Sequence, residues 1–158
     1  MSQFILLTLA SSRQGNIAGS VVKAGFEGLI EVFSTSHEIA IESSSSSIRS
    51  RFRTKHDVFA ITKGIDKATV LLYDSLIRSE RFSEMRLDCY STGEDGSLSR
   101  FYSVELKDAR IASIKQQLAD PSLSPISELE VVSFTYGTIT WLFADGSLEA
   151  SGNATLLN

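Results

Sequence analysis

The sequence predicts a mainly β protein with one α-helix. From residue 29 onward, apolar residues mostly recur at every second position, which is the period of strands that expose one face to water. Turn sequences containing glycine, aspartate or proline separate these runs. Only the segment 59–80 contains apolar residues at the three- and four-residue spacing of a helix. We therefore expect a β framework on which a single helix packs.

The chain length and composition fit one soluble domain. The 158 residues are enough to bury roughly 70% of the surface that the unfolded chain exposes. The net charge of −4 would repel nucleic acid and anionic lipid, so neither is an expected partner. No apolar run approaches the ~20 residues of a membrane-crossing helix. Cys89 is the only cysteine, which excludes an intrachain disulfide and a thiolate-rich metal site.

The first strand is expected at the apolar run Phe4–Leu9. A secretory signal is disfavoured, because no lysine or arginine precedes the run and because it is shorter than the usual ~7–15 apolar residues. If the protein leaves the cell, it must therefore use a dedicated secretion machine.

Two further strands form a predicted hairpin around the turn Gly93–Gly96. In the first, Met85, Leu87 and Cys89 alternate with polar neighbours. In the second, the same alternation places Tyr102, Val104 and Leu106 on one face. Another strand is expected after Asp108, and it runs through Ile111 and Ile114.

The segment Leu129–Phe143 is long for one strand, and its apolar pattern changes phase at Gly137. Before the glycine the apolar residues are even-numbered, and after it they are odd-numbered. A β-bulge at Gly137 would return both sets to one side of a single strand. Asp145-Gly146 then predicts a two-residue hairpin turn, followed by a short closing strand.

The helix is predicted at about 66–78, with Asp66 as its N-cap. Its expected packing stripe comprises Ala68, Leu72, Leu76 and Ile77. Two arginines, Arg78 and Arg81, suit the negative pole of the helix dipole near its end, so a local role is the simplest one.

An extended loop is predicted at about 43–55, where five serines precede a basic segment. Alternating arginines around a phenylalanine can grip phosphate, but a protein-contacting or solvated arm is favoured in this acidic chain. We expect this loop to contact another protein molecule. The candidate interface residues are Ser45, Ser47, Ile48, Arg49, Arg51, Phe52 and Arg53.

No catalytic, cofactor-binding or metal-binding set is predicted. His37 and His56 are the only histidines, and they lack the spacing that brings two imidazoles to one metal, so each is assigned a structural or surface role. The sequence contains neither a GxSxG nucleophile turn nor a phosphate-binding glycine loop followed by lysine. The paired carboxylates Glu94 and Asp95 lie in a turn, where they would meet solvent.

A series of motifs spread over most of the chain carries a family resemblance. In order they are GNIAGS, a strand ending in HE, a variable loop, FAITKGIDKAT, LLY with its helix, a strand ending in Tyr90, FYSVEL, an isoleucine-rich strand and VVSFTYGTITW. This order resembles the Hcp family, the haemolysin-coregulated proteins that form the tube of bacterial type VI secretion. The sequence departs from the family at Val70, where many members have proline, and in the Ser43–Ser47 run.

The resemblance implies a fold and a function. It implies one tube-like domain over residues 1–158, built as a β-barrel of two sheets with one flanking helix. It further implies a non-enzymatic subunit that forms hexameric rings, which stack into a hollow tube. A contractile sheath, a spike protein and secreted effectors would be its partners. Synthesis in the bacterial cytoplasm and secretion without a signal peptide would follow.

Three alternatives remain beside the tube subunit. A bacteriophage-type tail-tube protein would share the architecture. A monomeric barrel holding a small apolar ligand is a second alternative. An enzyme derived from a tube domain is the third, and it is disfavoured because too few residues lie outside the tube-like region to form another domain.

Overall fold

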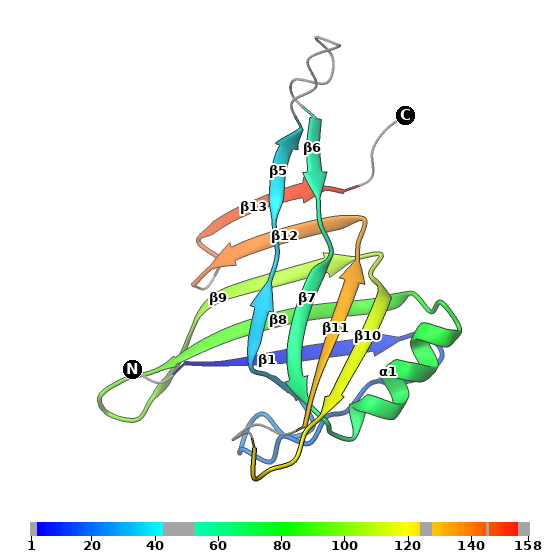
Figure 1. Ribbon diagram of the computed structural model, residues 1–158. Coiled ribbons are helices and arrows are strands. Elements are labelled where there is room, and N and C mark those ends of the chain that lie inside the picture. Colours follow the sequence, from blue (N-terminus) through cyan, green and yellow to red (C-terminus); the bar gives the residue numbers. More distant parts are fainter. Residues whose placement is uncertain (1–2, 43–52, 124–127, 145, 155–158) are drawn as a thin grey trace.

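Two antiparallel sheets lie across each other and enclose the hydrophobic core (Figure 1). The computed structural model describes residues 3–42, 53–123, 128–144 and 146–154. The larger sheet has seven strands: β1 (Gln3–Ser11), β2 (Gly15–Asn16), β3 (Ile30–Val32), β8 (Phe82–Thr92), β9 (Leu98–Lys107), β12 (Thr138–Phe143) and β13 (Leu148–Asn153). The smaller sheet has four: β4 (Ser34–Ser36), β7 (Phe59–Gly64), β10 (Arg110–Leu118) and β11 (Glu128–Thr135).

Two elements stand apart from these sheets. Among the strands that the structure describes, β5 (Ile39–Glu42) and β6 (Arg53–His56) pair only with each other, and they project beyond the end of the barrel (Figure 1). The helix α1 (Ala68–Ile77) flanks the barrel beside β10. The predicted architecture of two sheets with one flanking helix is confirmed. Within the described ranges, no helix has the length and apolar character needed to span a bilayer.

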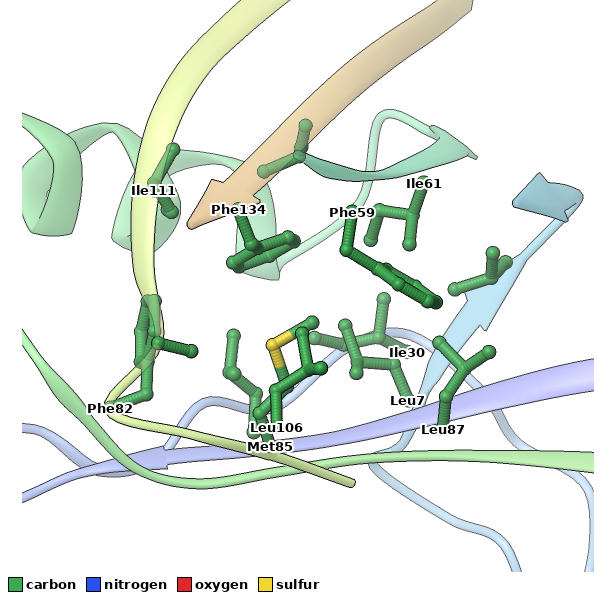
Figure 2. Packing of buried hydrophobic residues seen from close by; sticks show 14 of the residues in the cluster. Leu7, Ile30, Phe59, Ile61, Phe82, Met85, Leu87, Leu106, Ile111 and Phe134 are labelled. Carbon is green, nitrogen blue, oxygen red and sulfur yellow. The ribbon is translucent and has the colours of Figure 1, made fainter. Parts of the chain in front are cut away.

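The core forms where inward-facing residues of the two sheets meet. Cross-strand register aligns Leu7 with Leu87 and Leu87 with Val104, and all three side chains are buried. The opposite sheet contributes Phe59 and Phe134, which also pair across strands (Figure 2). These contacts confirm the predicted first strand and the predicted hairpin around 93–96, because alternate residues of β1, β8 and β9 face the core.

The prediction of a β-bulge at Gly137 is wrong, because the chain changes sheets there. Strand β11 belongs to the four-stranded sheet and β12 to the seven-stranded sheet. Phe134 before the glycine and Ile139 after it are both fully buried. Since the two sheets face each other, a change of phase at the corner keeps both apolar sets pointing inward.

Close packing at the corner favours glycine at position 137. A Cβ atom at Gly137 would lie 3.2 Å from Cβ of Asp108, which itself sits at the corner between β9 and β10 with a positive φ of 55°. The N–H of Gly137 donates to the carbonyl of Lys107 at 2.8 Å. Two sheet-changing corners are therefore joined at this point.

The helix differs in detail from its prediction. It begins at Ala68, and its N-cap position is occupied by Lys67, whose side chain makes no capping hydrogen bond. Asp66, the predicted cap, lies one residue earlier, where its Oδ1 accepts the N–H of Ala68 at 2.9 Å. Ala68 and Leu72 are buried as expected, but Ile77 is 81% exposed and is not part of the packing stripe.

Two loop predictions also need correction or qualification. The β12–β13 hairpin forms, but Phe143 pairs with Leu148, so the connecting loop has four residues rather than two. Gly146 adopts a φ of +93°, which only glycine takes up easily. Of the predicted interface residues, Arg53 begins β6, and Ser45, Ser47, Ile48, Arg49, Arg51 and Phe52 lie outside the described residues.

Candidate functional site

The two histidines converge at the base of the projecting hairpin. His37 lies just before β5 and His56 ends β6. His37 Nε2 and His56 Nδ1 each lie 2.7 Å from the hydroxyl oxygen of Tyr136, which is the residue before the corner at Gly137. We call His37, His56 and Tyr136 the imidazole cluster. Sequence reasoning missed it because the three residues come from distant segments with no shared spacing.

The environment of the imidazole cluster favours the neutral forms of His37 and Tyr136. Burial raises the pKa of Tyr136 to about 12, with a further contribution from the negative charge of Asp57. Burial also lowers the pKa of His37, repulsion from His56 lowers it further, and Asp57 opposes both effects. The ring of His37 packs against Phe59, with 5.2 Å between ring centroids. The hairpin is thus anchored to the barrel through the hydroxyl of Tyr136, and burial disfavours the charged forms of Tyr136 and His37.

A second polar group lies inside the barrel, beneath the first turn of α1. Lys63 on β7 and Glu130 on β11 pair directly across the two strands. Their side chains are 0% and 1% exposed, and Lys63 Nζ forms an ion pair with Glu130 Oε1. Asp66 and Thr69, at the start of the helix, complete what we call the ion cluster.

The ion cluster is dense in contacts. Lys63 Nζ lies 2.8 Å from both Asp66 Oδ1 and the carbonyl oxygen of Gly64. Thr69 Oγ1 donates to Glu130 Oε1 at 2.9 Å and accepts the N–H of Asp66 at 3.0 Å. Lys63 therefore faces two carboxyl side chains, and Glu130 Oε2 is buried without a hydrogen-bond partner in the part of the chain that the structure describes. This arrangement fixes the helix onto the sheet.

The sequence contains a signal for the ion cluster, because both of its buried charged residues stand in phase with apolar ones. Lys63 continues the alternation of Phe59 and Ile61, and all three side chains are buried. Glu130 likewise precedes Val132 and Phe134 at the same spacing. Two opposite charges placed in phase with apolar residues predict a buried pair if the two strands are known to be neighbours.

A third network connects the far half of α1 to the turn between β1 and β2. Arg13 contacts Asp74 at 2.5 Å and Glu80 at 2.9 Å, and Gln14 Nε2 donates to Ser75 Oγ at 2.8 Å. Hydrogen bonds from Arg13 and then Arg78 lower the pKa of Asp74. Because Arg13 and Asp74 are well exposed, this network positions the helix but is a weak source of stability.

The described part of the chain offers little for catalysis or metal binding. It contains no group of three or more histidine, cysteine or carboxylate side chains that could hold a metal ion. Side chains from both sheets fill the space between them (Figure 2). An open surface hollow of about 330 Å³ is lined by Phe4, Leu6, Ser20, Val21, Val22, Lys23 and Glu31. The packed interior argues against the alternative of a ligand held inside the barrel.

Several large apolar side chains lie outside the packed core and face solvent. On α1, Val70 is 74% and Ile77 is 81% exposed. They are seven residues apart, so they lie two turns apart on one side of the helix. Phe143 and Leu148 pair across the exposed end of the β12–β13 hairpin. Exposed apolar side chains mark a surface that another molecule covers where they form a contiguous patch.

Comparisons with known proteins give one consistent result. The family model described as "Type VI secretion system effector, Hcp" matches residues 8–143. The chain is similar to the Major exported protein of Pseudomonas aeruginosa, with 31% identity over 139 residues that cover 86% of this chain and 80% of that protein.

Solved structures agree with the sequence comparison. Secreted protein Hcp3 of P. aeruginosa is similar with a TM-score of 0.80 and 26% identity, covering 98% of this chain and 100% of that chain. Hcp1 from Escherichia coli has the same fold, with a TM-score of 0.83 and 22% identity over 96% of this chain and 98% of that chain.

Proposed function

Because this chain belongs to the Hcp family of type VI secretion proteins, we propose that it works as a tube subunit through contacts between identical copies. Six copies close into a ring, and rings stack into a hollow tube through which effectors pass. A closed ring needs two different complementary surfaces on each protomer, since head-to-tail contacts that close give a finite assembly. The proposed unit is one domain over residues 1–158 with no enzymatic activity of its own.

The observation that supports this proposal best is the pair of exposed apolar side chains on the outer side of α1. The helix buries Ala68 and Leu72 against its own barrel and presents Val70 and Ile77 outward. A helix that served only its own protomer would have a polar outer side. Both surfaces of this helix are therefore suited to packing, one within the protomer and one against a neighbour.

Measuring the mass of the purified protein tests ring formation. We expect mass photometry to show a species of about six times the protomer mass of 17.3 kDa. The double variant Val70→Ser with Ile77→Ser should remain folded, because exposed substitutions change stability by only about 0.5 kcal/mol, yet it should shift the population toward smaller species. A wild-type protein that stays monomeric at high concentration would refute the ring.

Stacking of rings is proposed to use the extended loop at about 43–55. The supporting observation is that β5 and β6, which flank residues 43–52 and of which β6 takes up the last part of the predicted loop, project beyond the barrel (Figure 1). Deleting residues 43–52 and joining the two strands with a short turn should leave rings intact and abolish tubes in electron micrographs. Tubes that still assemble would reject this role for the loop.

The remaining partners follow from the same proposal. A contractile sheath surrounds the tube, a spike protein caps it, and firing exports the protein from the bacterial cytoplasm. Immunoblots of culture medium should detect the protein in a strain with an intact sheath and lose it when the sheath gene is deleted. Equal amounts in both media would contradict export by this route.

A further inference from the structure

The imidazole cluster has a proton arrangement that a single added proton disrupts. A tyrosine hydroxyl carries one hydrogen to donate, and its oxygen can also accept. Tyr136 lies 2.7 Å from one ring nitrogen of each histidine. When both imidazoles are neutral, the hydroxyl donates to one of these nitrogens and accepts N–H from the other. Every group facing the hydroxyl is then satisfied.

Protonation of the accepting imidazole removes this match. Both facing nitrogens then carry hydrogen, and the hydroxyl hydrogen loses its acceptor within the cluster. Tyr136 as a whole is only 8% exposed. A buried donor without a partner is unfavourable, and a second protonation would place two cations around one oxygen.

The position of the cluster gives this local change a consequence for the hairpin. His37 and His56 are the residues that bracket β5 and β6, whereas Tyr136 belongs to the barrel corner. Backbone contacts outside this cluster at the hairpin base include the hydrogen bond from the N–H of Asp57 to the carbonyl of Glu38. Strands β5 and β6 pair only with each other among the described residues.

We propose that the His37–Tyr136–His56 cluster is a proton-sensitive clamp that holds the β5–β6 hairpin against the barrel at neutral pH and releases it on mild acidification. The hairpin then moves independently of the two sheets while the barrel stays folded. The clamp itself is independent of the proposed function; only its effect on ring stacking rests on that function.

The direction of the pH effect follows from His37. Its pKa in the folded protein is lowered, first by burial and then by His56. The clamp is therefore intact above the ordinary histidine pKa of about 6.5 and weakens as pH falls below that value toward the folded pKa. Among charged neighbours, Asp57 opposes the shift, and the side chains of Glu38 and Lys55 are exposed. The facing groups from β7 and β13, Phe59 and Gly152, are uncharged.

Hydrogen exchange measured by mass spectrometry tests the clamp directly. Rates are corrected for intrinsic exchange at about pH 7.5 and about pH 5.5, which bracket histidine titration. An isolated two-stranded hairpin is only marginally stable in water, so its strands should separate more often once it is released from the barrel. Peptides containing Ile39–Glu42 and Arg53–His56 should therefore lose protection by about fivefold or more on acidification, the scale of one lost hydrogen bond. Peptides from β8 should keep theirs. Equal protection of the hairpin peptides at both pH values would overturn the proposal.

Variants separate the clamp from general acid effects. The double variant His37→Gln with His56→Gln should lose the pH dependence of the hairpin, because glutamine does not titrate in this range. Tyr136→Phe should exchange rapidly in the hairpin at both pH values. A double variant that retains the wild-type pH response, or a Tyr136→Phe protein that is protected like wild type at neutral pH, would overturn the proposal.

Trp141 offers a second readout without a label, since it is the only tryptophan. A Cβ atom at Gly152 would lie 3.5 Å from His56 Cε1 and 3.6 Å from a ring carbon of Trp141, so both rings flank this point. Its emission should change with pH in wild type and stay constant in the double variant. An emission that responds equally in both proteins contradicts the clamp.

Ring formation and ring stacking are measured separately from hydrogen exchange in the hairpin. If rings form at both pH values but stack only at the higher one, the clamp regulates stacking; stacking that is equal at both values removes that regulatory role. Monomers at both pH values would refute the proposed function. The exchange experiment would still decide whether the clamp exists.

Discussion

The ion cluster and the imidazole cluster place polar side chains against the same barrel in opposite ways. The ion cluster brings one lysine and two carboxyl side chains together, and a helix covers it so that Lys63 Nζ and Glu130 Oε1 have several partners each. The imidazole cluster holds two histidines from the hairpin, and the single hydroxyl of Tyr136 connects them. Many contacts hold the ion cluster rigidly in place. The imidazole cluster depends on the position of one hydrogen, which makes it responsive to pH.

The largest expected effect comes from breaking the ion cluster. Lys63→Met leaves two carboxylates near each other, one of them almost fully buried. We expect a loss of about 3–5 kcal/mol in the free energy of unfolding, measured by denaturant titration, because an unpaired buried charge is strongly unfavourable. Lys67→Met changes an exposed lysine nearby and serves as the control.

A double variant sharpens this result. Lys63→Met combined with Glu130→Leu should recover most of the stability, because an apolar pair of similar volume can replace a buried ion pair. If the double variant is as unstable as the single one, the loss arises from packing and not from the unpaired carboxylate.

Removing the hydroxyl of Tyr136 from the imidazole cluster should lower the free energy of unfolding by less than Lys63→Met does. Tyr136→Phe takes away the group that both histidines contact while keeping the ring in the core. We expect a loss of about 1–3 kcal/mol from the unsatisfied partners, measured by thermal and chemical unfolding. The same change at half-buried Tyr73 of α1 is the matched control. Equal losses in the two variants would mean that the hydroxyl contacts add nothing.

Asp66→Ala tests the edge of the ion cluster. The variant loses the acceptor for the N–H of Ala68 and the contact with Lys63. We expect a loss of about 0.5–2 kcal/mol, the range of a lost helix cap. Asp66→Asn keeps a capping oxygen and removes the charge, so its melting midpoint separates the two contributions. An unchanged midpoint for Asp66→Ala would reject the cap.

The smallest expected effect is the pH dependence that His37 contributes. Its lowered pKa stabilises the folded state above about pH 6.5, and this contribution declines as pH falls toward the folded pKa. The melting midpoint of wild type should therefore drop more than that of His37→Gln between neutral and mildly acidic buffer. Parallel curves for the two proteins would show that His37 does not carry the dependence.

The sequence predicts the regular parts of this molecule well and its long-range contacts poorly. Alternation in β8 and β9 identifies two strands, because each side of a strand has one environment. The phase change at Gly137 is visible in the sequence, but its cause is the opposite sheet, which no local pattern reveals. A bulge and a corner give the same one-dimensional signal.

The candidate sites show the same division. The prediction for Asp66 used local capping chemistry, and the structure places its carboxylate on the N–H of Ala68. The convergence of His37 and His56 depends on Tyr136, 99 and 80 residues away along the chain. Such a meeting follows from the register of the barrel and not from spacing in the sequence.

The positions of the exposed residues Val70 and Ile77 on α1 depend on how the buried side of the same helix packs in the core. Val70 and Ile77 belong to the same ten-residue helix that buries Leu72 in the core on its other side. A core substitution that rotated the helix α1 about its axis would move both exposed side chains together. Changes invisible at the surface would then alter how neighbouring copies fit, so defects in assembly can originate from positions that touch no other copy.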